Sequence, residues 1–254
     1  MVEIYRKKFK VQGSEADFKQ NLKLSSLFHY LASASTEHAE IIGVGRNVVQ
    51  SYGAIWVALR VKVEIKRYPK WNENITVETW PEQPNKFDFH RNYIFYDKDD
   101  NIIAKALNVW VLIDQESRKL KKSSLISSEF PPLDFPLLNR EKVLNCELGK
   151  IKSSGNLHKV YEKTVGYSDI DMNEHLNNSK YVDYIMDCFS VEQHKKYFVK
   201  SIEVNYVREA LPGDSIVLYS DSSDFEQDII YIEGINKENN LNIFKSQIEM
   251  QKLN

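Results

Sequence analysis

Residues 166–185 read G-Y-S-D-I-D-M-N-E-H-L-N-N-S-K-Y-V-D-Y-I, and this stretch decides the fold. Its first half places polar side chains at every second position, at Asp171, Asn173 and His175. In an extended segment, at about 3.3 Å per residue, these side chains would leave the backbone on the same side. We therefore expect them to form one polar cluster of candidate catalytic groups.

The second half of the stretch changes to the period of a helix with one buried face. The large apolar residues at this spacing are Tyr181, Tyr184, Ile185, Cys188 and Phe189. We predict a helix over residues 178–192, which begins at the capping side chains Asn177, Asn178 and Ser179. Unpaired N–H groups at a helix start would form a site for an oxygen that carries developing negative charge.

The same order of elements occurs twice along the chain, which predicts two similar units. The elements expected in the first unit, residues 1–122, are a strand over 3–11, a helix over 25–42 and strands over 57–66, 75–80, 87–96 and 102–113. The elements expected in the second unit, residues 153–254, are a strand over 159–167, the helix over 178–192 and strands over 200–208, 215–221, 229–235 and 242–250. Residues 123–152 are rich in serine and proline and form the expected linker.

The two copies can be aligned residue by residue. A shift of 154 places Asp17 on Asp171 and Tyr30 on Tyr184. After the helix the shift becomes 141, so the first copy contains 154 − 141 = 13 extra residues near residues 43–52. We expect a loop or an extended strand there that helps to shape a pocket.

The candidate polar residues are present only in the second copy. The first copy has Lys19 in place of Asn173, Asn21 in place of His175 and Tyr68 in place of Glu209. We therefore expect the second unit to carry the chemistry and the first to contribute a wall, as after the fusion of a dimeric ancestor.

These features resemble the hot dog fold, and the tandem form resembles the acyl-acyl carrier protein thioesterases of plants and bacteria. That family carries a motif close to Y-S-D-x-D-x-N-x-H-x-N-N-x-K-Y, which residues 167–181 match throughout. The resemblance implies an α+β fold, a tandem hot dog in which two antiparallel sheets each wrap on a long helix. It also implies that Asp171, Asn173 and His175 are catalytic, together with Glu209 in an R-E-C segment. Ala210 replaces the cysteine of that segment here, which excludes a role for a thiol at this position.

The resemblance further implies a thioester hydrolase that releases free fatty acid from fatty acyl-acyl carrier protein and terminates fatty acid synthesis, with no metal and no organic cofactor. Asp171 would be the base or direct nucleophile, Asn173 and His175 would orient it and the thioester, and Glu209 would position water. Both direct attack by water and an acyl-enzyme intermediate stay open. The acyl chain would lie between sheet and helix of the first unit, with Trp56, Trp110 and residues 87–96 as candidate lining.

Two alternative functions also stay open. One is an acyl-CoA thioesterase of the same fold, and the other is a non-catalytic acyl-binding module. Taken alone, Asp171-x-Asn173 could be a capped loop, and Asp169-x-Asp171-x-Asn173 has the first ligand spacings of a calcium loop. The calcium interpretation fails further along, where Glu174 stands in place of glycine and Lys180 in place of the last glutamate.

Composition limits the partners and the location. A formal net charge of −2 over 254 residues argues against a nucleic-acid binder. We expect an acidic acyl carrier protein to dock on basic clusters, which are Arg6, Lys7, Lys8 and Lys10, then Arg118, Lys119, Lys121 and Lys122, then Lys195 and Lys196. No run is long enough to span a membrane, no transit peptide is apparent, and the two cysteines, Cys146 and Cys188, suggest neither a disulfide nor a zinc site. We expect a bacterial-type cytoplasmic protein, two chains of which could associate as a homodimer.

Overall fold

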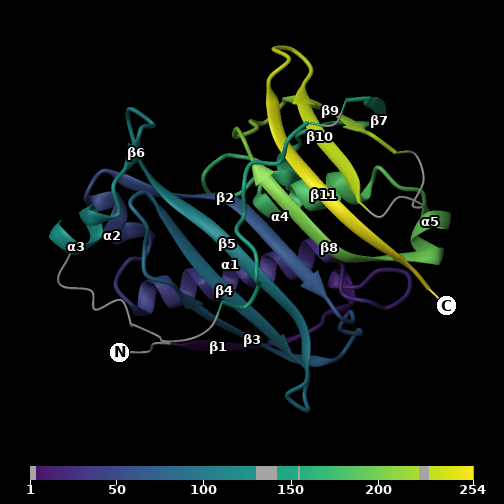
Figure 1. Ribbon diagram of the computed structural model, residues 1–254, viewed down its shortest axis with the longest axis horizontal. Coiled ribbons are helices and arrows are strands. Elements are labelled where there is room, and N and C mark those ends of the chain that lie inside the picture. The colour runs from purple at the N-terminus through teal and green to yellow at the C-terminus, as the bar shows by residue number, and fades with distance from the viewer. Residues whose placement is uncertain (1–3, 130–141, 154, 223–228, 254) are drawn as a thin grey trace. The chain divides into compact units, whose positions relative to one another are not determined.

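The computed structural model describes residues 4–129, 142–153, 155–222 and 229–253. It divides into two compact units. Unit 1 consists of Met1–Ala16, Gln20–Leu22 and His29–Leu148, and unit 2 consists of Asp17–Lys19, Lys23–Phe28 and Gly149–Asn254. Figure 1 shows that each unit contains antiparallel strands with a helix packed along them.

Unit 1 contains an antiparallel sheet with the strand order β1-β3-β4-β5-β2, and the short β6 pairs with the end of β5. The strands are β1 (Tyr5–Lys10), β2 (Ala54–Ile65), β3 (Asn74–Pro81), β4 (Asp88–Tyr96), β5 (Ile102–Asp114) and β6 (Leu120–Lys121). The helical elements are the short 3-10 helix η1 (Gly13–Glu15), α1 (Leu24–Ile41), α2 (Arg46–Ser51) and α3 (Ser124–Glu129). The part of α1 from His29 onward belongs to unit 1, and its residues up to Phe28 belong to unit 2. Tyr5, Lys7 and Phe9 lie on one face of β1, because alternate side chains of a strand point the same way. From this face Phe9 stacks on Tyr30 of α1, with 4.1 Å between ring centroids.

Unit 2 repeats this plan with the strand order β8-β11-β10-β9-β7. Its elements are β7 (His158–Thr164), the 3-10 helix η2 (Tyr167–Asp169), α4 (Asn178–Met186), α5 (Val191–Lys196), β8 (Tyr197–Tyr206), β9 (Ser215–Ser220), β10 (Ile230–Asn236) and β11 (Asn242–Lys252). Tyr181 of α4 packs edge-on against Tyr206 and Phe244, with centroid distances of 5.3 and 5.6 Å. These contacts fix the first turns of α4 on the sheet.

The two central hairpins share one register and one bulge. In unit 1 Phe95 pairs with Ala104 next to the bulge, and in unit 2 Gly234 pairs with Phe244 at the same place. The phenylalanine of the pair thus lies on the first strand of the hairpin in unit 1 and on the second strand in unit 2, and the small residue lies opposite it. A Cβ atom on Gly234 would lie 2.2 Å from the Phe244 ring, so the glycine makes room for that ring.

Two expectations about helices are wrong. The predicted helix over residues 178–192 ends at Met186, and a separate helix begins after Ser190, whose side chain accepts the Gln193 N–H at 3.2 Å. The Ser190/Gln193 pair is a capping box, a signal for a new helix that was present in the sequence. The extra segment over residues 43–52 contains the helix α2, not a loop or an extended strand.

Part of the predicted linker packs against unit 1. Residues 123–129 contain α3, residues 130–141 lie outside the described part, and the chain then returns over the sheet. Leu144 and Leu148 join Leu107 and Val109 in one apolar cluster. Among the described residues, no helix is long and apolar enough to cross a membrane.

Candidate active site

The loop before α4 is a tight turn. Ile170 and Leu176 form an antiparallel bridge, and inside it the Asp171 N–H donates to the His175 carbonyl at 2.9 Å. The Glu174 N–H donates to the Asp171 carbonyl at 3.0 Å, and Glu174 has a φ of +63°. The expectation of an extended segment is therefore wrong, because a residue in the left-handed region reverses the chain between Asn173 and His175.

Asp171 and Asn173 are held to each other inside this loop. Oδ1 of Asp171 accepts the backbone N–H of Asn173 at 2.8 Å, and Nδ2 of Asn173 lies 3.5 Å from Oδ2 of Asp171. An aspartate that bonds the backbone two residues ahead stabilises such a turn by itself. The carboxylate is thus fixed in place and partly shielded, while Asn173 is exposed.

His175 and Glu209 come together from separate segments. The Leu176 N–H donates to the Ala210 carbonyl at 2.9 Å, which lays the loop beside the turn after β8. Nδ1 of His175 then lies 3.6 Å from Oε1 of Glu209, and the side chains are 28% and 37% exposed. The pair is an ion pair whenever the imidazole is protonated, and both groups remain accessible to a substrate.

Tyr181 is a member of the site that sequence reasoning placed only in the apolar stripe. Burial raises the pKa of its hydroxyl, the backbone of Ala210 lowers it, and the charges of Glu209 and Asp171 raise it. The Tyr181 hydroxyl therefore lies within electrostatic reach of two predicted catalytic carboxylates. The sequence did contain a signal for this role, because Tyr181 lies in the first turn of the helix that follows the polar loop.

Asp169 supports the loop from below. Its Oδ2 accepts the Gly166 N–H and the Tyr184 hydroxyl, each at 3.0 Å, and its carbonyl accepts the Asn177 N–H at 2.9 Å. Asp169 is 5% exposed. The Asp169 carboxylate therefore stabilises the turn.

Within the described ranges, no three or more His, Cys, Asp or Glu side chains lie close enough together to bind a metal ion.

The start of α4 offers one free donor. Asn177 is the N-cap, as expected, and its Oδ1 accepts the Ser179 N–H at 2.9 Å. Its carbonyl accepts the Lys180 N–H at 2.8 Å. In the part of the chain that the structure describes, the Asn178 N–H has no hydrogen-bond partner. Of the N–H groups predicted to stabilise an oxyanion at this helix start, this one therefore remains available.

The first copy builds the same loop without the candidate groups. Oδ1 of Asp17 accepts the Lys19 N–H at 2.8 Å, and Gln20 has a φ of +60°. The Lys19 ammonium donates to the carbonyls of His194, at 2.6 Å, and Tyr197, at 3.2 Å. The counterpart of Asn173 is thus a structural residue.

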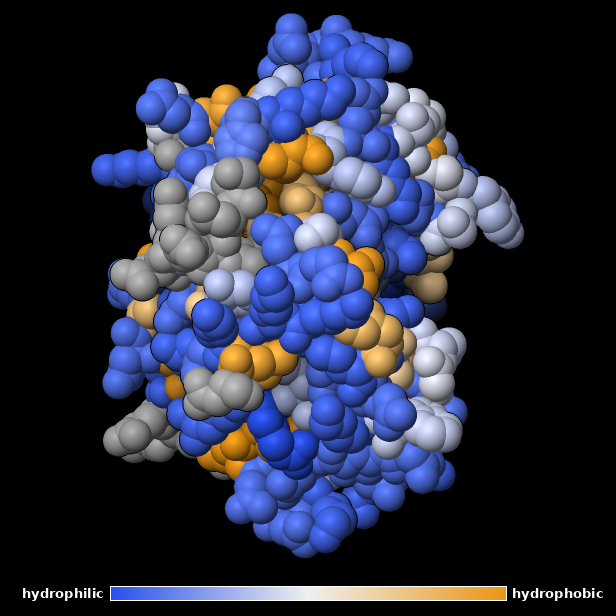
Figure 2. Space-filling model, turned by 90° about the vertical axis from the view of Figure 1, so that its right-hand side faces the viewer, coloured by the Kyte–Doolittle hydropathy of each residue, from blue (hydrophilic) through white to orange (hydrophobic). Residues whose placement is uncertain are grey.

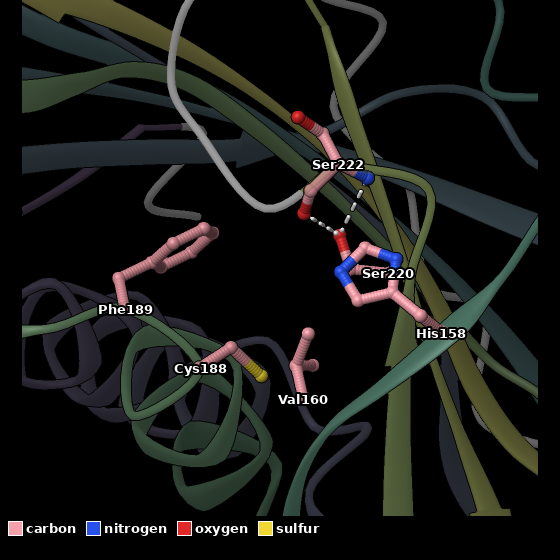
Figure 3. Close-up of a pocket in the computed structure, with 6 residues that line it drawn as sticks. All are labelled: His158, Val160, Cys188, Phe189, Ser220 and Ser222. Atoms are coloured by element: carbon pink, nitrogen blue, oxygen red, sulfur yellow. Dashed lines mark hydrogen bonds between the residues drawn. The ribbon is translucent and has the colours of Figure 1, made fainter.

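A pocket of about 220 Å³ lies within unit 2, near the other end of α4 (Figure 3). Its lining residues are His158, Val160, Cys188, Phe189, Ser220 and Ser222. Burial raises the pKa of the Cys188 thiol, so this cysteine is a poor nucleophile. A nine-residue helix is about 13 Å long, and this length separates the pocket from the candidate catalytic loop.

A helix packed on an antiparallel sheet, repeated within one chain and carrying a polar loop at the second helix entry, defines a double hot dog protein. Solved structures share this fold. An acyl-ACP thioesterase from Bacteroides thetaiotaomicron has a TM-score of 0.88 at 24% identity, and the 12:0-ACP thioesterase from Umbellularia californica has 0.83 at 17% identity. Each match covers 98% of both chains. The predicted fold class, an α+β tandem hot dog, is confirmed.

Two family models cover most of the sequence. The acyl-ACP thioesterase N-terminal domain matches residues 2–125, and the C-terminal domain of the same family matches residues 153–252. The chain belongs to the acyl-ACP thioesterase family.

Plant relatives are similar over a large part of the chain. The oleoyl-acyl carrier protein thioesterase of Coriandrum sativum is 25% identical over 227 residues, which is 84% of this chain and 61% of the relative. The palmitoyl-acyl carrier protein thioesterase of Arabidopsis thaliana is 25% identical over 237 residues, which is 85% of this chain and 54% of the relative. The chain thus spans less than two thirds of the length of these relatives.

Proposed function

We propose that this chain is a thioester hydrolase that releases free fatty acid from fatty acyl-acyl carrier protein and so terminates fatty acid synthesis. The observation that carries the proposal is the meeting of His175 and Glu209 beside the Asp171–Asn173 turn, in a member of this family. The names of the plant relatives, which act on oleoyl- and palmitoyl-acyl carrier protein, support the substrate class.

We assign the chemical steps to these residues. Asp171 acts either as the base that takes a proton from the attacking water or as the nucleophile that attacks the thioester carbonyl, and Asn173 holds its carboxylate in place. Glu209 and His175 position the attacking water, and the Asn178 N–H stabilises the oxyanion. The C–S bond breaks, the oxygen of water ends on the acyl carbon, and one proton of that water goes to the carrier sulfur, so that a free carboxylic acid and the carrier thiol remain.

We assign the acyl chain to the space between α1 and the sheet of unit 1. Support comes from the first copy of the loop, whose counterparts of the catalytic groups have other roles, and from the additional helix α2. Of the predicted lining, Trp56 packs edge-on against Phe89 at 4.7 Å and donates to the Val44 carbonyl at 2.9 Å. These contacts make Trp56 a core residue at the edge of this space.

The proposal is tested by release of free thiol from palmitoyl- and oleoyl-acyl carrier protein, with wild type and Asp171→Ala side by side. We expect rapid release by wild type and a loss of several orders of magnitude in the variant. The same acyl groups on coenzyme A measure the carrier preference. Binding of the acylated carrier protein without release would refute the hydrolase and favour an acyl-binding module.

We propose α5 as part of the docking surface for the acidic carrier protein. Hydrophilic residues predominate on the face drawn in Figure 2. Lys195 pairs with Glu192 at 2.7 Å, and the charges of both Lys195 and Lys196 lower the pKa of Glu192. Charge reversal at both lysines should raise KM for acylated carrier protein at low salt, and equal reversal at the exposed Lys66 and Lys98 should not. An unchanged KM would refute this docking surface.

We also propose a cytoplasmic location. Cys146 and Cys188 are free cysteines, which fits a reducing compartment. Fractionation of cells that produce the tagged chain is the direct measurement.

A further inference from the structure

Unit 1 contains buried polar side chains on the face of its sheet that meets α1. Arg91 and Tyr93 of β4 and Asn108 and Trp110 of β5 make up this group, which we call the polar layer. Arg91 and Asn108 are directly paired across the two strands. Nη1 of Arg91 lies 2.9 Å from Nδ1 of His38 on α1, which places the layer between helix and sheet.

Three atoms of the polar layer lack a hydrogen-bond partner. They are the Tyr93 hydroxyl, Oδ1 of Asn108 and Nε1 of Trp110, each shielded from solvent and unpaired within the described residues. Tyr93 is 0% exposed and Asn108 is 5% exposed. Buried groups of this kind are costly unless a ligand or an ordered water completes their bonds.

The three groups lie near one another. Burial raises the pKa of the Tyr93 hydroxyl, while the Arg91 charge and the side chains of Ser35, Trp110 and Asn108 lower it. The three side chains are therefore near neighbours, although none reaches hydrogen-bonding geometry with another. Together, the three unpaired atoms could bond one small group that both accepts and donates.

Arg91 adds further donors to this space. It is 8% exposed, and its other contact is the Thr79 hydroxyl at 3.4 Å. No carboxylate pairs with it in the part of the chain that the structure describes. Burial lowers the pKa of Arg91. A buried guanidinium without a counter-charge favours an oxygen atom nearby.

Unit 2 shows that the fold does not require this layer. Counted from the turn of each central hairpin, the pair Ile230–Ile248 occupies the register position of Arg91–Asn108. Both isoleucines are 0% exposed. An apolar pair therefore packs at the same place, so this position of the fold can be filled without polar side chains.

We propose that the polar layer binds an oxygen substituent on the acyl chain, so that this protein selects hydroxylated fatty acyl groups. A hydroxyl can accept from the Trp110 N–H and the Tyr93 O–H and donate to Oδ1 of Asn108. This inference rests on the proposed function, in which the acyl chain lies in unit 1.

The test compares binding of palmitic acid and of monohydroxypalmitic acids, with the hydroxyl at successive positions, to the wild-type chain by calorimetry. We expect at least one positional isomer to bind about tenfold more tightly than palmitic acid, because a site built to bond a hydroxyl disfavours a chain that lacks it. Equal binding of all the acids would overturn the proposal and indicate that the layer holds ordered water only.

Variants locate the effect. Tyr93→Phe should remove most of this preference, because the hydroxyl group of the ligand loses one of its donors. Tyr231→Phe, which removes a buried hydroxyl bonded to Glu233 in unit 2, should keep the preference. If Tyr93→Phe does not fold, Trp110→Phe removes a second donor from the same layer. A preference that survives in the folded variant contradicts the assignment to the polar layer.

Hydrolysis separates this inference from the proposed function. Carrier protein loaded with palmitoyl or with the preferred hydroxypalmitoyl group is compared by kcat/KM. Release of both groups at equal rates, with equal binding of the acids, refutes the inference alone. Selective binding of the hydroxy acid without release of either group refutes the proposed function and leaves the inference standing.

Discussion

The Tyr184 hydroxyl donates a hydrogen bond to Oδ2 of Asp169 at 3.0 Å, and this bond ties α4 to the turn before the candidate catalytic loop. In the first copy the Tyr30 hydroxyl donates to Oε2 of Glu15 at 2.6 Å. The repeat has kept the bond, although an aspartate and a glutamate differ in length. The bond is therefore part of the scaffold that both loops share.

Tyr184→Phe should lower the free energy of unfolding by about 1–2 kcal/mol, since Asp169 loses a buried donor. It should also lower kcat several-fold, because the loop that carries Asp171 loses its support. Tyr30→Phe is the matched control, with a similar loss of stability and an unchanged kcat. Denaturant unfolding and thiol release measure both, and equal kcat in the two variants would contradict a positioning role.

Asp171→Ala should reduce kcat by about 10²–10⁴-fold, the range of a lost general base or nucleophile. Asp17→Ala removes the equivalent carboxylate, which accepts the Lys19 N–H at the same 2.8 Å distance. We expect the two variants to lose similar thermal stability and only the first to lose activity. Equal activity of the two variants would contradict a catalytic role for Asp171.

Glu209→Gln keeps the size of the side chain and removes the charge 3.6 Å from His175. We expect kcat/KM to fall by roughly 10²-fold with little change in the melting temperature, because the side chain is partly exposed. Glu174→Gln, an exposed change within the candidate catalytic loop, is the control and should keep full activity. Parallel losses in both variants would point to a general effect of charge.

Gly234→Ala should destabilise unit 2 by about 1–3 kcal/mol, because the new Cβ would lie 2.2 Å from the fully buried Phe244 ring. Gly149→Ala is the control, since no atom lies within 4 Å of a Cβ there. The melting temperatures of the two variants, measured by thermal unfolding, test this prediction. Equal melting temperatures would mean that the ring moves aside without cost.

Asp97 should make stability depend on pH at the β4–β5 turn. The Asn101 backbone N–H, which it accepts at 2.9 Å, and the Arg67 guanidinium lower the pKa of Asp97 to about 2 from the ordinary value of 3.8. A depressed folded-state pKa stabilises the fold above the ordinary value, and this stability is lost as the pH falls through about 2.

Asp97→Asn should therefore lower the melting temperature at neutral pH, and the difference from wild type should close as the pH falls from about 4 to about 2. Asp99→Asn, an exposed carboxylate of the same turn, should show little difference at either pH. A difference for Asp97→Asn that is constant across this range would contradict the assignment.

The order of strands and helices could be predicted from the sequence because each element has its own local pattern. β2 alternates between apolar and polar residues, and α1 has an apolar stripe that marks its buried face. The alignment of the two copies could also be read from local sequence. Gln20 and Glu174, which this alignment pairs, both have a left-handed backbone conformation. The break after Met186 was missed because the apolar period continues through Cys188 and Phe189 while the capping box begins at Ser190.

The fold class, the repeat and the residues of the polar motif could all be predicted from the sequence, since spacing and capping act within a few residues of chain. Only the tertiary structure decided which groups meet. Glu209 reaches His175 because a backbone bond joins two segments more than thirty residues apart, and no periodicity records such a bond. The polar layer likewise appears only when β4, β5 and α1 pack together, because a buried atom without a partner is a property of three dimensions.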